Sequence, residues 1–218
     1  MKKFTAEFIG TFSMVFCGTG AIVINETTNG AVTHIGIAIT FGLIVMAMIY
    51  SLGTISGSHI NPAVTIAFAV ANKFPVKKVL PYIVFQLAGA FCASLVLKFL
   101  FPDNLLLGTT LPAASELQSF ILEIILTFFL MFVIINVSHG SKEQGLMAGI
   151  AIGSVVLLEA MFAGPISGAS MNPARSIAPA FVSGNINHLW IYIFAPLIGS
   201  ILAVFTYKII TPPTQEIY

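Results

Sequence analysis

Six apolar segments of the chain are each long enough to cross a lipid bilayer, and they constrain the fold more than any other feature. They cover residues 4–24, 34–52, 79–101, 118–138, 144–163 and 188–210, and turn-forming or charged residues separate them. A helix needs about 20 apolar residues to span the hydrocarbon core. Because backbone polar groups in lipid must be satisfied within the protein, we expect an all-α membrane protein with six transmembrane helices.

The low charge of the chain excludes several other classes of protein. Only 8% of its 218 residues are charged, whereas a soluble domain carries about 25%. So few charges cannot cover a water-facing surface, which excludes a soluble enzyme and a disordered protein. The net charge of +1, with no basic stripe, excludes a nucleic-acid-binding protein. The sequence shows no nucleophile–base pair and no metal-ligand spacing, so we expect no enzymatic activity, no metal and no cofactor.

The lysines predict how the chain is oriented in the membrane. Loops on one side of the six-span arrangement carry Glu26, Asp103 and Glu116, with Lys98 near a helix end. The other side carries Lys2, Lys3, Lys73, Lys77, Lys78, Lys142 and Lys208. The positive-inside rule therefore places both termini in the cytoplasm. We expect the chain in the inner (plasma) membrane. The basic N-terminus resembles a signal peptide, but the apolar run continues far enough to span, so we expect an uncleaved first helix.

Two further apolar stretches, residues 61–71 and 172–182, have only about half the length of a span. Both begin with Asn-Pro-Ala. Asparagine is a favoured N-cap and proline is favoured at the first helical position, so each stretch has a well-marked helix start. We expect two half-length, re-entrant helices in addition to the six spans.

These two stretches belong to an internal repeat. Residues 6–12 recur with similar sequence as residues 122–128, and residues 55–63 recur as residues 166–174. We expect a single channel domain over residues 1–218, with a first repeat over about 1–101 and a second over about 116–210. Each copy holds three spans and one half-span, so the second copy enters the membrane from the opposite side. Interrupted segments at matching positions of an inverted 3+3 repeat point to a transport site near the midplane.

The two Asn-Pro-Ala boxes, the six spans and a glutamate in the first span of each half resemble the aquaporin, or major intrinsic protein, family. The resemblance covers nearly the whole chain. Residues 48–51, 55–57 and 162–176 are similar to the plant nodulin-like subfamily and its bacterial relatives. The resemblance implies an aquaporin-like fold, a passive channel for water and small neutral solutes, and a homotetramer in the lipid bilayer.

The paired boxes supply a mechanism for excluding protons and ions. A half-helix that starts at the midplane presents its positive end there, and two such ends repel cations. Two asparagine side-chain donors on one water molecule turn its hydrogens outward and break a continuous proton wire. Ordinary helix starts would explain one box, but not two at equivalent positions. The predicted pore residues are Asn61, Pro62, Ala63, Asn172, Pro173 and Ala174.

Arg175 is the only arginine and lies one turn into the second half-helix. An arginine at membrane depth is costly and indicates a functional site. The family resemblance places it in an outer aromatic/arginine constriction with Phe41, Ala160 and Ala169. Two alanines widen this filter relative to the strict water channels of the family, which favours polyols or hydroxylated metalloids beside water. Against this, Ser176 stands where the glycerol facilitators have aspartate, so the choice of solute stays open.

The segments that precede the boxes are small and contain glycine. Non-helical backbone is tolerated at membrane depth only where it lines a wet cavity or is buried in protein. Their carbonyls would form a ladder of acceptors for a permeating solute. The predicted ladder is Ser56, Gly57, Ser58 and His59, with Ser167, Gly168, Ala169 and Ser170. A hydrogen-bonded loop histidine is an equal alternative for His59.

Three carboxylates lie inside predicted spans. The resemblance assigns Glu7 and Glu123 to bracing the two loops through backbone N–H groups. Glu159 has no mate in the other repeat. It could hold the second loop near Arg175 or face a neighbouring subunit, and we favour the first of these.

The sequence leaves two alternatives to a water channel. One is a facilitator mainly for glycerol or hydroxylated metalloids. The other is a small secondary transporter, which also uses inverted repeats and broken helices. A transporter predicts ion-coupling carboxylates beside the breaks, where this chain has amides and one arginine. The loop at residues 138–143 is too short to assign a pH or phosphorylation switch.

Overall fold

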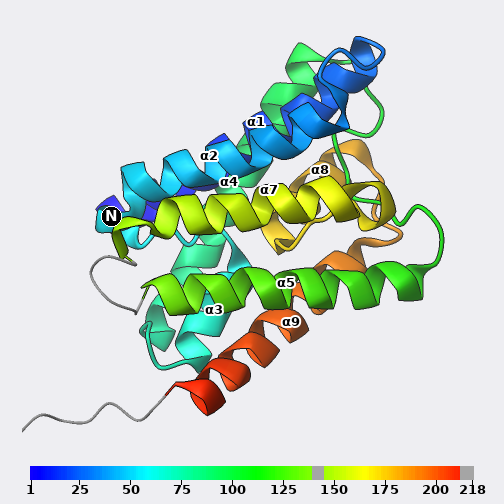
Figure 1. Ribbon diagram of the computed structural model, residues 1–218. Coiled ribbons are helices and arrows are strands. Elements are labelled where there is room, and N and C mark those ends of the chain that lie inside the picture. The colour runs from blue at the N-terminus through cyan, green and yellow to red at the C-terminus, as the bar shows by residue number, and fades with distance from the viewer. Residues whose placement is uncertain (139–144, 212–218) are drawn as a thin grey trace, which may run out of the picture.

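The computed structural model describes residues 1–138 and 145–211 and is helical throughout its regular elements (Figure 1). Six long helices have the length and hydropathy of membrane spans. They are α1 (Lys2–Thr27), α2 (Thr33–Ser56), α4 (Val79–Leu100), α5 (Glu116–Ser138), α7 (Ala148–Ser167) and α9 (Leu189–Ile210). Two short helices are α3 (Pro62–Val70) and α8 (Pro173–Ser183), and a 3-10 turn, η1 (Val76–Lys78), precedes α4. The predicted fold of six spans and two half-helices is confirmed.

Two of the spans end four residues later than the sequence predicted. Helix α2 continues to Ser56 rather than residue 52, and α7 continues to Ser167 rather than residue 163. Each ends at a glycine in the left-handed conformation, with φ of 92° at Gly57 and 84° at Gly168. Left-handed glycine is a common helix stop, so both helices continue until that residue is reached. Lys142 and most of the loop at 138–143 lie outside the described residues.

The two halves of the chain repeat the same close helix crossing. Helix α1 packs on α4 in the first half, and α5 packs on α9 in the second. At these crossings a Cβ on Gly89 would overlap the carbonyl oxygen of Phe8, and one on Gly199 would overlap that of Ile124. Lipid tails are as apolar as the helices, so membrane helices associate through such close backbone contacts at small residues.

The halves meet where α2 lies beside α7 (Figure 1). Gly42 and Gly153, which are repeat equivalents, face each other at this crossing. A Cβ added to either glycine would lie 2.7 Å from the carbonyl oxygen of the other. The pair therefore brings one helix of each half into backbone contact near the centre of the molecule.

The half-helices point into the bundle from opposite sides. Helix α3 lies toward the side that holds the N-terminus and the end of α9, and α8 lies toward the other side (Figure 1). They have 9 and 11 residues, which at about 1.5 Å per residue is roughly half of a 30 Å hydrocarbon core. Each begins at an asparagine N-cap followed by proline.

The distribution of side chains fits a lipid environment. The long helices expose large apolar side chains, such as Phe129, Leu158, Phe194 and Phe205. The exposed charges of the spans lie near their ends, whereas Glu7, Glu123 and Glu159 within the spans and Arg175 of α8 are buried. This is the arrangement expected of a multi-pass membrane protein with a polar interior path.

Candidate functional site

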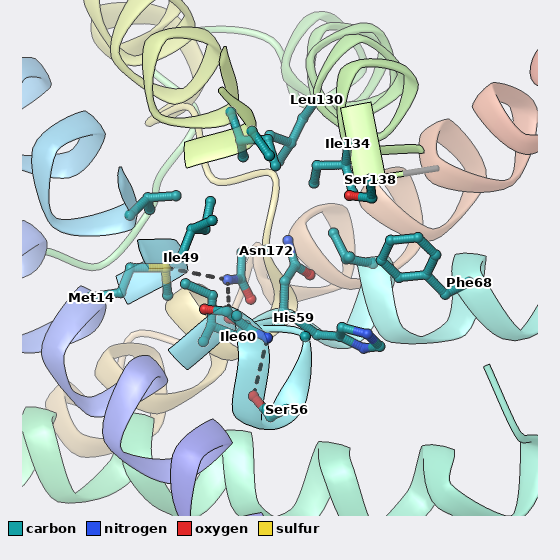
Figure 2. Close-up of a pocket in the computed structure, with 18 of the residues that line it drawn as sticks. Met14, Ile49, Ser56, His59, Ile60, Phe68, Leu130, Ile134, Ser138 and Asn172 are labelled. Atoms are coloured by element: carbon teal, nitrogen blue, oxygen red, sulfur yellow. Dashed lines mark hydrogen bonds between the residues drawn. The ribbon is translucent and has the colours of Figure 1, made fainter. Parts of the chain in front are cut away.

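A cavity of about 830 Å³ passes between the ends of the two half-helices. Leu130 and Ile134 of α5 form one wall, opposite His59 and Ile60 of the first loop (Figure 2). The predicted site residues that line it are Phe41, Ser56, Gly57, Ser58, His59, Asn61, Ala160, Ala169, Ser170, Asn172 and Arg175. Those outside the lining are Pro62, Ala63, Ser167, Gly168, Pro173 and Ala174. The remaining two, Glu7 and Glu123, lie behind the loops.

The two box asparagines bind across the junction of the half-helices. Asn61 Nδ2 donates to the Met171 carbonyl at 2.8 Å, and Asn172 Nδ2 donates to the Ile60 carbonyl at 2.9 Å. Each amide nitrogen carries a second hydrogen. That of Asn172 faces the sulfur of Met14 at 3.6 Å, a weak acceptor (Figure 2). The cross-bonds fix both side chains at the cavity wall and leave donor capacity for a solute.

The first loop is anchored on Glu7 of α1, whose side chain is fully buried. Its two carboxylate oxygens accept the backbone N–H groups of His59 at 3.0 Å and Ile60 at 2.7 Å. Gln86 of α4 also donates to Glu7 at 2.8 Å, and to Thr65 of α3 at 3.0 Å. The carboxylate thus satisfies backbone donors that a non-helical loop would otherwise leave unpaired at membrane depth.

Glu123 of α5 does the same for the second loop. Its oxygens accept the backbone N–H groups of Ser170 and Met171, both at 2.8 Å, and the hydroxyl of Ser167 at 2.7 Å. The side chain is fully buried. Both loops are therefore held by a bidentate carboxylate from the first helix of their own half.

Two tyrosines that were not among the predicted site residues hold the ends of α2 and α7. Tyr82 donates its hydroxyl to the Ser56 carbonyl at 2.8 Å, and Tyr192 donates to the Ser167 carbonyl at 2.7 Å. Both carbonyls were predicted as part of the acceptor ladder, but each already accepts a tyrosine hydroxyl. The tyrosines are repeat equivalents, so an alignment of the two halves could have indicated them.

Arg175 is buried at the side of the cavity near α8, with 2% of its surface exposed. Its Nη1 donates to the carbonyl of Gly108 at 2.7 Å, and its guanidinium carbon lies 5.1 Å from the centre of the Phe41 ring. Its Nε has no hydrogen-bond partner among the described residues. Gly108 follows α4 in a turn where Leu107 and Gly108 both have positive φ. No sequence pattern pointed to the Gly108 carbonyl as a partner of Arg175.

The other proposed filter residues reach the same cavity from three elements. Phe41 comes from α2, Ala160 from α7 and Ala169 from the second loop. A Cβ on Gly18 of α1 would overlap the Phe41 ring, so this glycine provides the space that the ring occupies.

This architecture is matched by known proteins. The sequence profile described as "Major intrinsic protein" matches residues 1–207. The chain belongs to the major intrinsic protein family. Nodulin-26 of Glycine max is 46% identical over 211 residues, covering 96% of this chain and 78% of that relative. "Aquaporin NIP1-1" of Zea mays is 44% identical over 221 residues, covering 100% and 78%. The X-ray structure of the aquaglyceroporin from Plasmodium falciparum superimposes with a TM-score of 0.88 at 28% identity, covering 96% of each chain.

The predicted similarity to nodulin-like aquaporins is thus confirmed. The major intrinsic proteins are channels rather than enzymes, as the sequence indicated.

His59 of this major intrinsic protein is both at the cavity and firmly held. Its ring packs against Phe68, Phe74 and Tyr82, with ring centres 4.9, 4.7 and 5.2 Å away. Its Nδ1 lies 3.2 Å from the Thr65 hydroxyl. His59 thus lines the cavity and is also a hydrogen-bonded loop histidine.

Glu159 does not hold the second loop, contrary to our expectation. Neither carboxyl oxygen has a hydrogen-bond partner within the described part of the chain. The side chain is 1% exposed, so it does not face a neighbouring subunit either. Helix α7 turns it toward the protein interior together with Ala160 and Ala163, which are also buried. The loop is instead held by Glu123.

Proposed function

We propose that this major intrinsic protein is a passive channel for water, driven only by concentration gradients. One observation carries the proposal. The starts of α3 and α8 meet end to end, and their N-cap asparagines Asn61 and Asn172 line one cavity. Each asparagine is fixed by a bond to the opposite loop. A water molecule at this junction meets two side-chain donors and the positive ends of two helices.

The same arrangement accounts for the exclusion of protons and ions. Two donors bind the oxygen of the central water, so its hydrogens point outward and neighbouring waters take opposite orientations on the two sides. A continuous hydrogen-bonded wire is then broken. Two helix N-termini and the buried Arg175 guanidinium add a positive field that disfavours cations.

We propose that the carbonyls of residues 57–59 and 168–170, which accept no hydrogen bond from the described residues, provide the acceptor ladder. The carbonyls of Ser56 and Ser167 are bonded to Tyr82 and Tyr192 and are left out of it. Phe41, Ala160, Ala169 and Arg175 form the proposed outer filter.

The two alanines favour passage of small neutral solutes in addition to water. Neither side chain reaches far across the cavity, and the structurally similar Plasmodium protein is described as an aquaglyceroporin. A facilitator mainly for glycerol or hydroxylated metalloids is the alternative within this class. A secondary transporter is disfavoured because amides and one arginine lie at the breaks, and the carboxylates of Glu7 and Glu123 behind the loops already accept backbone N–H groups. Ion coupling needs carboxylates that are free to exchange ions.

We further propose a plasma-membrane location with both termini in the cytoplasm, based on the lysine distribution. The family resemblance supports a homotetramer.

Swelling of proteoliposomes tests the solute preference. After an osmotic jump with glycerol or boric acid, we expect re-swelling to be clearly faster than in empty liposomes. Ala160→His narrows the filter, so we expect it to lower glycerol permeability about tenfold while water permeability is largely retained. Stopped-flow light scattering measures both rates. If liposomes with the wild-type protein take up glycerol no faster than empty liposomes, the wide filter is contradicted and the protein is a strict water channel.

A further inference from the structure

A proline interrupts the hydrogen bonding of α7 close to the proposed filter. Pro165 lies inside this helix and has no N–H group. The carbonyl four residues earlier, that of Met161, therefore loses its helical donor. In a membrane the surrounding protein must satisfy such a freed carbonyl, because lipid cannot.

His34 supplies the missing donor from the other half of the chain. Its Nε2 lies 2.6 Å from the carbonyl oxygen of Met161. A carbonyl only accepts, so the ring nitrogen is the donor. Gly164 leaves the space for the ring, since a Cβ there would lie 3.0 Å from His34 Cε1. The proline, the glycine and the histidine therefore form one local arrangement.

The bond joins the two helices that carry opposite parts of the filter. His34 lies in the first turn of α2, and Phe41 lies two turns further along the same face of that helix. Met161 directly follows Ala160 on α7. Deeper in the bundle, the contact of Gly42 with Gly153 joins the same two helices. Two contacts, His34 with Met161 and Gly42 with Gly153, thus fix α2 and α7 to each other on either side of the filter residues.

The arrangement does not recur at the other end of the helix pair. The repeat equivalent of Pro165 is Thr54, which keeps its N–H. There, Tyr50 of α2 donates its hydroxyl to the Leu146 carbonyl at 3.3 Å. Among the described residues, the proline break and its histidine donor lie at the end of the helix pair that carries Arg175 and the proposed filter.

We propose that His34 is a positioning residue for this filter. Its bond to the Met161 carbonyl fixes the distance between Phe41 and Ala160, and thereby the discrimination between water and larger neutral solutes. This inference rests on the proposed filter and assigns it a new determinant outside the cavity lining.

A double-mutant cycle with Pro165 tests the proposal. His34→Phe keeps the ring but removes the donor, and we expect the ratio of glycerol to water permeability to change at least about threefold. His34→Gln retains a side-chain donor and should stay near the wild-type ratio. Pro165→Ala gives residue 165 a backbone N–H that can donate to the Met161 carbonyl. In that background, His34→Phe should change the permeability ratio little further. His188→Phe, which removes a histidine that binds Glu116 elsewhere, is the matched control and should leave the ratio unchanged.

Each outcome is decisive when assembly is checked by size-exclusion chromatography. An unchanged ratio in His34→Phe overturns the proposal, and so does an equal change with and without Pro165→Ala. If His34→Phe fails to assemble, the double variant decides: it also lacks the bond between α2 and α7, so a ratio changed as in Pro165→Ala alone supports the proposal, and any other result overturns it. A wild-type protein that conducts no water would instead defeat the proposed function, independently of this cycle.

Discussion

Replacing Glu123 with alanine is expected to abolish accumulation of the folded protein. Its carboxylate accepts two backbone N–H groups, from Ser170 and Met171, and the Ser167 hydroxyl, all fully inside the protein. Each buried donor left without a partner costs about 1–3 kcal/mol, and more where the lost partner is charged. The summed cost of three such donors approaches the whole free energy of unfolding of a typical protein, about 5–15 kcal/mol.

Glu123→Gln separates loss of volume from loss of acceptors. The amide has nearly the same size, but it offers one oxygen and turns an NH₂ group toward a backbone N–H. We therefore expect it to be strongly destabilised as well. Glu116→Gln is the matched control, because Glu116 is exposed and binds only His188 in the described structure. Thermal unfolding in detergent, followed by size-exclusion chromatography, measures the effect. Wild-type stability of Glu123→Gln would contradict the bracing role.

Replacing Arg175 with alanine is expected to open the channel to larger solutes and to cations. The variant removes the buried guanidinium that lies against the Phe41 ring and binds the Gly108 carbonyl. A barrier lowered by about 1.4 kcal/mol raises flux about tenfold. We expect an increase of at least this size in cation leak, a clear increase in glycerol permeability, and retained water permeability.

Arg175→Lys shows whether charge alone is sufficient. Lysine keeps the positive charge but cannot stack on Phe41 with a planar fork, so we expect cation exclusion to be retained and solute discrimination to be altered. Re-swelling rates measure the solutes, and a trapped ion-sensitive dye measures the cations. Arg175→Ala with wild-type selectivity for both would show that Arg175 is not part of the filter.

The regular parts of this protein could be predicted because they depend on local sequence. Span length follows from the apolar runs, and the half-helices follow from an asparagine N-cap and a proline at the next position. The internal repeat then predicted that the two Asn-Pro-Ala boxes meet. The exact ends of α2 and α7 depend on where a glycine takes the left-handed conformation, which apolar patterning does not show.

Contacts between distant segments were harder to foresee. Comparing the halves could have indicated Tyr82 with Tyr192, and Gly89 with Gly199, because each pair occupies equivalent positions. No such signal exists for Gln86, whose equivalent is a proline.

Contacts in which a loop or a glycine accommodates one distant side chain were equally hard to predict from the sequence. The Gly108 carbonyl meets Arg175 only because the connection after α4 folds back into the bundle. Gly18 is explained by one aromatic ring, that of Phe41, on a different helix. The prediction for Glu159 was wrong. Its position next to Ala160 in the sequence suggested a hydrogen bond to the second loop, but neither carboxyl oxygen bonds to any described residue.

Water flux and proton flux measured in the same proteoliposomes test the central claim most directly. Stopped-flow light scattering follows osmotic shrinkage, and a trapped pH-sensitive dye follows protons while valinomycin and potassium hold the membrane potential at zero. The account predicts water permeability well above that of empty liposomes, with proton flux equal to theirs. Folded protein that does not raise water permeability, or that raises proton flux along with it, would contradict a channel built on the paired ends of α3 and α8.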